Sequence, residues 1–282
     1  MKKEFRSYNV KTIETPTTLE VWEYLDESVV YAVNVGDKES SKSEYDDELE
    51  ADDYNDLSAC EHYDALKRKQ KHYKEMRWVI ARIVDCNFDV NTKFMTLTFK
   101  ENLQDICYTN YELSKFIKRM NYHLYHVKKQ CLKYLAVWEK QKRGAIHYHI
   151  IFFALPYIRT KKIQEIWGHG FVKINKIVVD SIDNTGRYAS KYFTKDIDDK
   201  NYKQKSFFMS QNLKRPITRR MTQYELSDFS NENVVFSKVY SRKVPDFYSL
   251  INTGTESTSF KTYVVKYTRM RKEENHDYDI KN

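Results

Sequence analysis

The amino-acid sequence predicts an α+β protein in which an antiparallel sheet of about five strands carries helices. Three observations support this fold class. Strand-like segments are joined in places by turns too short for a parallel crossover. Segments with apolar residues three and four positions apart lie between other strands, as expected for amphipathic helices. The 23 tyrosines, 15 phenylalanines and 4 tryptophans supply enough large side chains for a core, which argues against general disorder.

Five segments have the β-branched and aromatic composition of strands, with turn residues near their ends. They are residues 78–88, 93–99, 132–139, 145–155 and 171–179. The fourth, AIHYHIIFFAL, is apolar on both of its faces. A strand of this kind is expected in the middle of a sheet that is covered on both sides.

Three helices are expected between and after these strands. The first begins with Asn110 as its cap and continues with apolar residues at helical spacing. A short helix, KKIQEIW, follows a cap at Thr160, and a third, RYASKYFTKDI, begins at Asp183 or Thr185. The alternation of these helices with antiparallel strands completes the α+β prediction.

Charge is distributed unevenly along the chain. Residues 1–76 hold 11 basic and 19 acidic side chains, a net charge of −8, whereas residues 77–282 hold 37 basic and 21 acidic ones, a net charge of +16. The overall net charge of +8 therefore hides a strongly basic body. Such a body predicts a polyanionic partner, most commonly nucleic acid, although a solvated basic surface is the alternative interpretation.

Composition also divides the chain into five predicted parts. We expect an N-terminal arm with short strands, an acidic disordered linker, a basic helix, a central domain and a basic C-terminal extension. In that order, they are residues 1–35, 36–56, 57–76, 77–200 and 201–282.

Several classes of protein are excluded by what the sequence lacks. No segment fits the glycine patterns of a P-loop or a dinucleotide-binding fold, GxxxxGK[ST] or GxGxxG. No apolar run approaches the roughly 18 residues of a membrane span, and the first residues lack the apolar stretch of a signal peptide. Four scattered cysteines form no CxxC pair, so we expect reduced thiols and a cytoplasmic location.

The first chemical motif is the HYH triplet in the strand at 145–155. Residues two apart on a strand point to the same face, so His147 and His149 lie together. Glu139 ends the preceding strand, and the KQKRG turn would bring its carboxylate beside the two imidazoles. Two imidazoles and a carboxylate with open positions predict a divalent metal site. Two hydrogen-bonded histidines without a metal are the alternative interpretation.

The second motif is a polar stripe on the predicted third helix. Tyr188, Lys191, Tyr192 and Lys195 are at positions i, i+3, i+4 and i+7 and therefore share one face. Packed tyrosine rings with lysines reaching to solvent would explain this stripe structurally. Beside a metal site in a basic domain, a tyrosine hydroxyl is instead a candidate nucleophile, and lysines can stabilise the charge that develops on a phosphate.

Three motifs in this order resemble the HUH endonuclease domain of rolling-circle replication initiators. They are FMTLTF at 94–99, HYH at 147–149 and YASKYFTK at 188–195. The sequence is most similar to replication proteins of single-stranded DNA phages and related plasmids, whose tyrosine motif is YxxKYxxK. The phrases VWEKQKRGAIHYHIIFF, IWGHGFVKI and KSFFMSQNLKRP extend the similarity to about Pro216.

The resemblance implies a fold, a cofactor and a role for each motif. The central domain would be an HUH endonuclease related to ferredoxin-like folds, and the first motif, with Thr96 and Thr98, would be mainly structural. The metal would be Mg²⁺ or Mn²⁺, held by Glu139, His147 and His149. One of the two tyrosines, Tyr188 or Tyr192, would attack the scissile phosphate, assisted by Lys191 and Lys195.

The implied reaction is the nicking of single-stranded origin DNA, at a stem-loop, with a 5′-phosphotyrosyl intermediate and a free 3′-OH primer. The second tyrosine would transfer and religate the strand at termination. A host or separate helicase and a DNA polymerase would be partners, since the chain has no P-loop. Candidate phosphate contacts in the C-terminal extension are Lys214, Arg219 and Arg220, which read equally well as an ordinary basic loop.

Other functions remain open at this point. A single-tyrosine HUH transposase is the main alternative, although the paired tyrosines argue against it. A non-catalytic protein that binds single-stranded DNA would explain the aromatic and basic composition. A 2-His-1-carboxylate iron oxygenase would explain the metal ligands and leave the tyrosine–lysine stripe unexplained.

Overall fold

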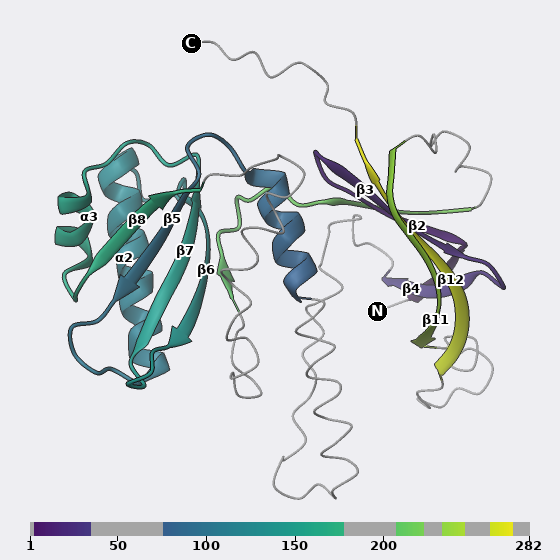
Figure 1. The fold of residues 1–282 in the computed structure, drawn as a ribbon, viewed down its shortest axis with the longest axis horizontal. Coiled ribbons are helices and arrows are strands. Elements are labelled where there is room, and N and C mark those ends of the chain that lie inside the picture. The colour runs from purple at the N-terminus through teal and green to yellow at the C-terminus, as the bar shows by residue number, and fades with distance from the viewer. Residues whose placement is uncertain (1–2, 35–75, 178–206, 223–232, 246–259, 273–282) are drawn as a thin grey trace, which may run out of the picture. The chain divides into compact units, whose positions relative to one another are not determined.

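The computed structural model describes residues 3–34, 76–177, 207–222, 233–245 and 260–272 (Figure 1). The chain forms two compact units, one of Met1–Glu50 with Pro216–Asn282 and the other of Ala51–Arg215. The predicted linker at 36–56 and nearly all of the predicted basic helix at 57–76 lie outside the described residues. The five-part division of the chain therefore stays a prediction.

The unit of Ala51–Arg215 contains a five-stranded antiparallel sheet, as the sequence predicts. The strand order is β8-β5-β7-β6-β9. The bounds of these strands are β5 Lys93–Thr98, β6 Lys133–Lys140, β7 Ile146–Phe153, β8 Val172–Lys176 and β9 Phe208–Met209. Every neighbouring pair is antiparallel, and β7 is central between β5 and β6.

Helices cover both faces of this sheet, which explains the two apolar faces of β7 (Figure 1). On one face, α2 (Ile106–Tyr125) and α3 (Thr160–Trp167) pack around residues such as Tyr148 and Phe152. On the other, the helical residues 76–87 contribute Ile80, Ile83 and Val84 to a second core with strand residues from β6 and β7. The fold class is thus confirmed, with three helices among the described residues.

The prediction of a strand at 78–88 is wrong, because residues 76–87 are helical. The fully buried side chains of Ile80, Ile83 and Val84 are three and four positions apart and form one helical stripe. Their β-branched character favoured a strand, but the spacing of the buried side chains decides the structure. The fifth strand of the sheet is the short β9 instead.

Two predicted helix caps also need correction. The first helix begins at Ile106 rather than after Asn110, and Asp105 caps it by accepting bonds from the backbone N–H groups of Cys107 (2.8 Å) and Tyr108 (3.2 Å). Asn110 instead accepts a 2.7 Å hydrogen bond from the buried Tyr148 hydroxyl. The short helix includes Thr160, and its cap position is Arg159, which makes no side-chain capping bond. The predicted third helix lies outside the described residues.

The other unit joins strands from the two ends of the chain. Its five-stranded sheet has the order β10-β2-β3-β12-β11, and a separate ribbon pairs β1 with β4. The bounds are β1 Lys3–Tyr8, β2 Val10–Glu14, β3 Thr18–Tyr24, β4 Val29–Asn34, β10 Ile217–Met221, β11 Val234–Pro245 and β12 Phe260–Arg271. The predicted N-terminal strands are therefore present, and they share a sheet with the C-terminal segment.

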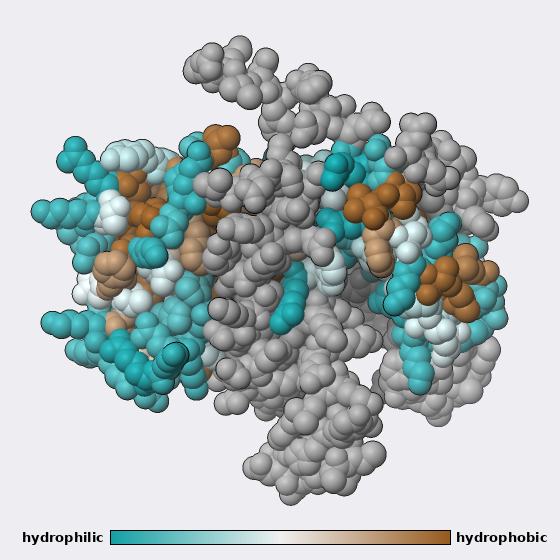
Figure 2. Space-filling view, in the orientation of Figure 1, coloured by the Kyte–Doolittle hydropathy of each residue, from teal (hydrophilic) through white to brown (hydrophobic). Residues whose placement is uncertain are grey.

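Most large apolar side chains of the described residues belong to the cores of the two units. On the face drawn in Figure 2, apolar side chains gather in small patches between hydrophilic ones. None of the described helices has the length and apolar character needed to cross a membrane.

Candidate metal centre

The register of three neighbouring strands brings the predicted metal ligands together. In the β6–β7 hairpin, Glu139 is directly opposite His147. On the other side of β7, Thr98 is opposite His147 and Thr96 is opposite His149. Residues opposite each other in antiparallel strands share a face, so all five side chains lie on one face of the sheet.

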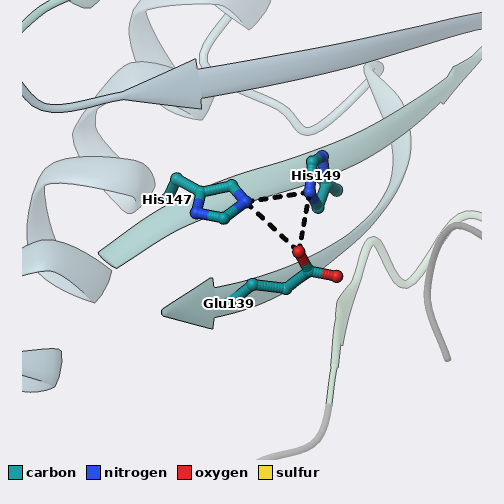
Figure 3. A group of neighbouring side chains, drawn as sticks. All are labelled: Glu139, His147 and His149. Atoms are coloured by element: carbon teal, nitrogen blue, oxygen red, sulfur yellow. Dashed lines mark hydrogen bonds and ion pairs between the residues drawn. The ribbon is translucent and has the colours of Figure 1, made fainter. Parts of the chain in front are cut away.

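The three polar groups converge on one point (Figure 3). The Glu139 Oε2 atom lies 3.2 Å from Nε2 of His147 and 3.0 Å from Nε2 of His149. The two Nε2 atoms are 3.0 Å apart, and the two rings are nearly perpendicular at an interplanar angle of 89°. Both imidazoles thus turn the same nitrogen toward a single carboxylate oxygen.

This arrangement fits a divalent metal ion. Neutral imidazole nitrogen and carboxylate oxygen are ligands for such ions, and the three ligand atoms lie within 4.8 Å of one another. In octahedral coordination with bonds of about 2.1 Å, neighbouring ligand atoms are about 3.0 Å apart. The separations of 3.0–3.2 Å match one face of such an octahedron and leave the opposite positions for substrate or water.

The site lies where the covered part of the sheet face ends. Leu135, Val137 and Ile151 fill the apolar part of this face under the helix at 76–87 and are almost fully buried. The side chains of Glu139 and His147 are each 12% exposed and that of His149 is 17% exposed. The ligands are therefore held firmly and remain accessible to a substrate from one side.

The two imidazoles differ in their support. Nδ1 of His149 is 3.1 Å from Oγ1 of Thr96, and its ring stacks on Phe94 with centroids 5.3 Å apart. Nδ1 of His147 is buried and has no hydrogen-bond partner among the described residues. If Nε2 of His149 binds a metal, its Nδ1 carries the proton and donates it to Thr96. Such hydrogen bonds orient metal-binding histidines.

Sequence reasoning assigned Thr96 only a structural part and did not single out Phe94. The available signal was the alternation in the segment 93–99, which places Phe94, Thr96 and Thr98 on one face. The missing information was the register between β5 and β7, which puts this face beside the histidines.

The metal centre lies in the part of the chain that is similar to a known family. Residues 92–197 match the family model for the replication-associated protein ORF2. This match confirms the resemblance to replication initiators for that segment and indicates a part in DNA replication. No curated protein and no solved structure matched the chain in the same comparisons.

The matched segment spans the elements from β5 to β8 and therefore includes all three candidate ligands. It also includes the predicted tyrosine stripe, whose four residues lie outside the described residues: Tyr188, Lys191, Tyr192 and Lys195. Their roles stay predictions that rest on the sequence motif.

The three candidate phosphate contacts fall in different units, with Lys214 in one and Arg219 and Arg220 in the other. The backbone N–H of Lys214 donates to Oδ1 of Asn87 at 2.9 Å, which leaves its exposed side chain available. Arg219 forms a 2.8 Å ion pair with Glu14. The Arg220 guanidinium lies 4.7 Å from the centroid of the Tyr31 ring. The arginines thus have intramolecular contacts, and their contact with DNA stays a prediction.

Proposed function

We propose that this protein initiates rolling-circle replication by nicking single-stranded DNA at an origin. The observation that carries the proposal is the convergence of Glu139, His147 and His149 within the segment that matches the ORF2 family of replication-associated proteins. A part in replication follows from the family match, and the nicking chemistry is the proposal. Residues 77–200 would form the endonuclease domain.

In this proposal, Glu139, His147 and His149 hold Mg²⁺ or Mn²⁺. A bound divalent ion would polarise a phosphate oxygen and neutralise part of the charge of the transition state. The three side chains themselves fix the site on adjacent strands, so that little rearrangement is needed when a phosphodiester binds. Their partial burial strengthens the electrostatic interaction with the phosphate.

The covalent step uses one of the two tyrosines, Tyr188 or Tyr192. Its phenolic oxygen forms a bond to phosphorus and gives up its proton, while the bond between phosphorus and the 3′-oxygen breaks. The 3′-oxygen takes up a proton and becomes the primer hydroxyl, and the 5′ end stays attached to the tyrosine. Lys191 and Lys195 stabilise negative charge during this exchange. The second tyrosine repeats the exchange at termination and religates the strand.

The partners in this proposal are a single-stranded origin site in a stem-loop, a host or separate helicase and a DNA polymerase. The reaction would take place in the cytoplasm of the host cell. The C-terminal extension, including Lys214, Arg219 and Arg220, would add contacts to DNA phosphates.

The test is the formation of a covalent protein–DNA adduct. We would incubate the protein with single-stranded oligonucleotides that tile the replicon origin, in Mn²⁺ and in EDTA, and separate the products on a denaturing gel. An SDS-resistant adduct that requires the metal is expected. Its absence on every oligonucleotide would contradict the proposal and favour a protein that only binds single-stranded DNA. Adducts confined to transposon ends would favour the transposase alternative.

A further inference from the structure

The edge strand β8 presents a row of side chains on the face that holds the metal centre. Val172 is buried, and Ile174 packs against the core formed with α2 and α3. Because side chains alternate along a strand, Phe171, Lys173 and Asn175 point to the opposite face. We call these three residues the β8 strip.

The register of β8 fixes the position of the strip relative to the metal centre. Lys173 is opposite Thr96 on β5, and Thr96 is opposite His149 on β7. Lys173 and His149 are thus two strand spacings apart, about 9–10 Å between their backbones. A lysine side chain can cover much of that distance.

The start of the strip is held close to β5 by its neighbours. The backbone N–H of Thr98 donates to the carbonyl of Phe171 at 3.0 Å. A side chain at Gly170 would collide with the carbonyl oxygen of Thr98, so glycine is needed for this close approach. These contacts place Phe171 beside the row of Thr98, His147 and Glu139.

All three side chains of the strip are exposed, and Phe171 is 61% exposed. A large aromatic side chain in that position contributes little to a core. Within the described part of the chain, the Lys173 ammonium and the Asn175 amide form no ion pair or side-chain hydrogen bond. An aromatic ring, a cation and an amide are therefore available side by side along about 13 Å of strand.

These groups match the three parts of a single-stranded nucleotide chain. Aromatic rings stack on bases, lysine binds phosphate, and asparagine forms hydrogen bonds with base edges. Bases in a duplex are already stacked and paired, so only a single strand can offer a free base face to Phe171. We propose that the β8 strip binds the single-stranded DNA that flanks the phosphate at the metal centre. This inference rests on the proposed nicking of single-stranded DNA and names where that DNA lies.

The strand itself supplies a matched control. Lys176 is also exposed on β8, but the alternation of side chains places it on the face away from the metal centre. Lys173→Ala and Lys176→Ala therefore remove the same charge from the same strand on opposite faces. If the strip binds DNA, the two variants differ, whereas a general effect of net charge is the same for both.

The experiment measures binding of a fluorescent 20-nucleotide oligo(dT) by anisotropy over a range of salt concentrations. All variants are made in a Tyr188→Phe/Tyr192→Phe background with Mn²⁺ present, so that cleavage does not disturb the equilibrium. Lys173→Ala should weaken binding and make the log–log salt slope shallower by about 0.7, the loss of one phosphate contact. Lys176→Ala should leave the slope unchanged.

Phe171 gives an independent measurement that does not depend on charge. Loss of one base–aromatic stack corresponds to about a fivefold or larger rise in Kd, so Phe171→Ala should weaken oligo(dT) binding by at least that factor. Phe171→Tyr should restore binding. Unchanged melting temperatures would exclude misfolding as the cause, and a duplex of the same length should be insensitive to Phe171→Ala.

Equal effects of Lys173→Ala and Lys176→Ala, together with unchanged binding by Phe171→Ala, would overturn the proposal. The outcome is independent of the adduct test. Adduct formation without any effect of the strip would leave the nicking function intact and place the DNA elsewhere. Strip-dependent binding without adducts would retain the DNA site and overturn the nicking chemistry.

Discussion

Thr96 and His149 lie opposite each other on β5 and β7, with Oγ1 of Thr96 3.1 Å from Nδ1 of His149. This hydrogen bond leaves Nε2 of His149 directed at Glu139 and His147. The stacked Phe94 ring restricts the same imidazole from its side. The first motif of the sequence therefore acts on the metal centre through the orientation of one histidine.

The first prediction concerns this hydrogen bond. Thr96→Val keeps the shape of the side chain and removes its oxygen, so His149 loses the acceptor for Nδ1–H. We expect the Mn²⁺ affinity to fall by about 10- to 100-fold, as is typical for outer-shell changes. Thr96→Ser should retain most of the affinity. Titration of free Mn²⁺ by electron paramagnetic resonance measures both, and equal affinities for Val and Ser would show that the hydrogen bond is unimportant.

The second prediction separates chemistry from folding at His147. Because Nδ1 of His147 has no partner in the described part of the chain, His147→Ala breaks no hydrogen bond outside the metal centre. We expect metal-dependent cleavage of origin oligonucleotides to be abolished while oligo(dT) binding changes less than about threefold. Gel assays of cleavage and anisotropy measurements of binding test this. A parallel loss of cleavage, binding and thermal stability would indicate a folding role instead.

The third prediction is that a metal stabilises the folded protein. A ligand that binds only the native state at 100 times its Kd adds about 2.7 kcal/mol to the free energy of unfolding. For a domain of this size that corresponds to a rise in Tm of roughly 5–10 °C. Thermal melting with Mn²⁺ or Mg²⁺ should show this rise, and EDTA should reverse it. Glu139→Gln should melt at the same temperature with and without metal, since its neutral amide is a weak ligand.

The fourth prediction distinguishes the two tyrosines. Tyr188→Phe and Tyr192→Phe each remove one nucleophile, so a single variant should retain some covalent adduct if the other tyrosine can take its place. The double variant should form none. Mass spectrometry of the adducted peptide from the wild-type protein identifies the attacking residue. An adduct in the double variant would place the nucleophile elsewhere in the chain.

The metal centre was predictable from sequence because its information is local. Glu139, His147 and His149 lie on one hairpin, and strand alternation with a short turn is enough to bring them together. Strand β7 was equally clear, because its two apolar faces require a central position. Thr96 joins the site through the β5–β7 register, which depends on pairing across more than 50 residues and is not encoded in any short segment.

The errors had physical causes of the same kind. The helix at 76–87 is rich in β-branched residues, and only its buried stripe at Ile80, Ile83 and Val84 indicates the helix. Pairing of β3 with β12 joins residues near the two ends of the chain, and no local pattern in either strand specifies its partner. The structure was thus predictable where neighbours in sequence are neighbours in space.

A second polar cluster, on the other face of the sheet, leads to a prediction about acid stability. Glu112 on α2 is 4% exposed, and its carboxylate lies 2.9 Å from the Lys115 ammonium and 2.9 Å from Nε2 of His169. The hydrogen bond from Lys115 lowers the pKa of Glu112 below its ordinary value of 4.5. Burial opposes this effect, and the hydrogen bond from His169 adds to it.

The fifth prediction follows from the sign of that shift. A lowered pKa in the folded protein means that the unfolded chain binds more protons in acid, so this contribution to stability is present above pH 4.5 and is lost as the pH falls through the folded pKa. Glu112→Gln cannot titrate. Its Tm should be lower than that of the wild type near neutral pH, and the difference should shrink as the pH approaches about 3. Melting curves across this range test the prediction, and a difference in Tm that stays constant with pH would show that the carboxylate charge at Glu112 does not stabilise the fold.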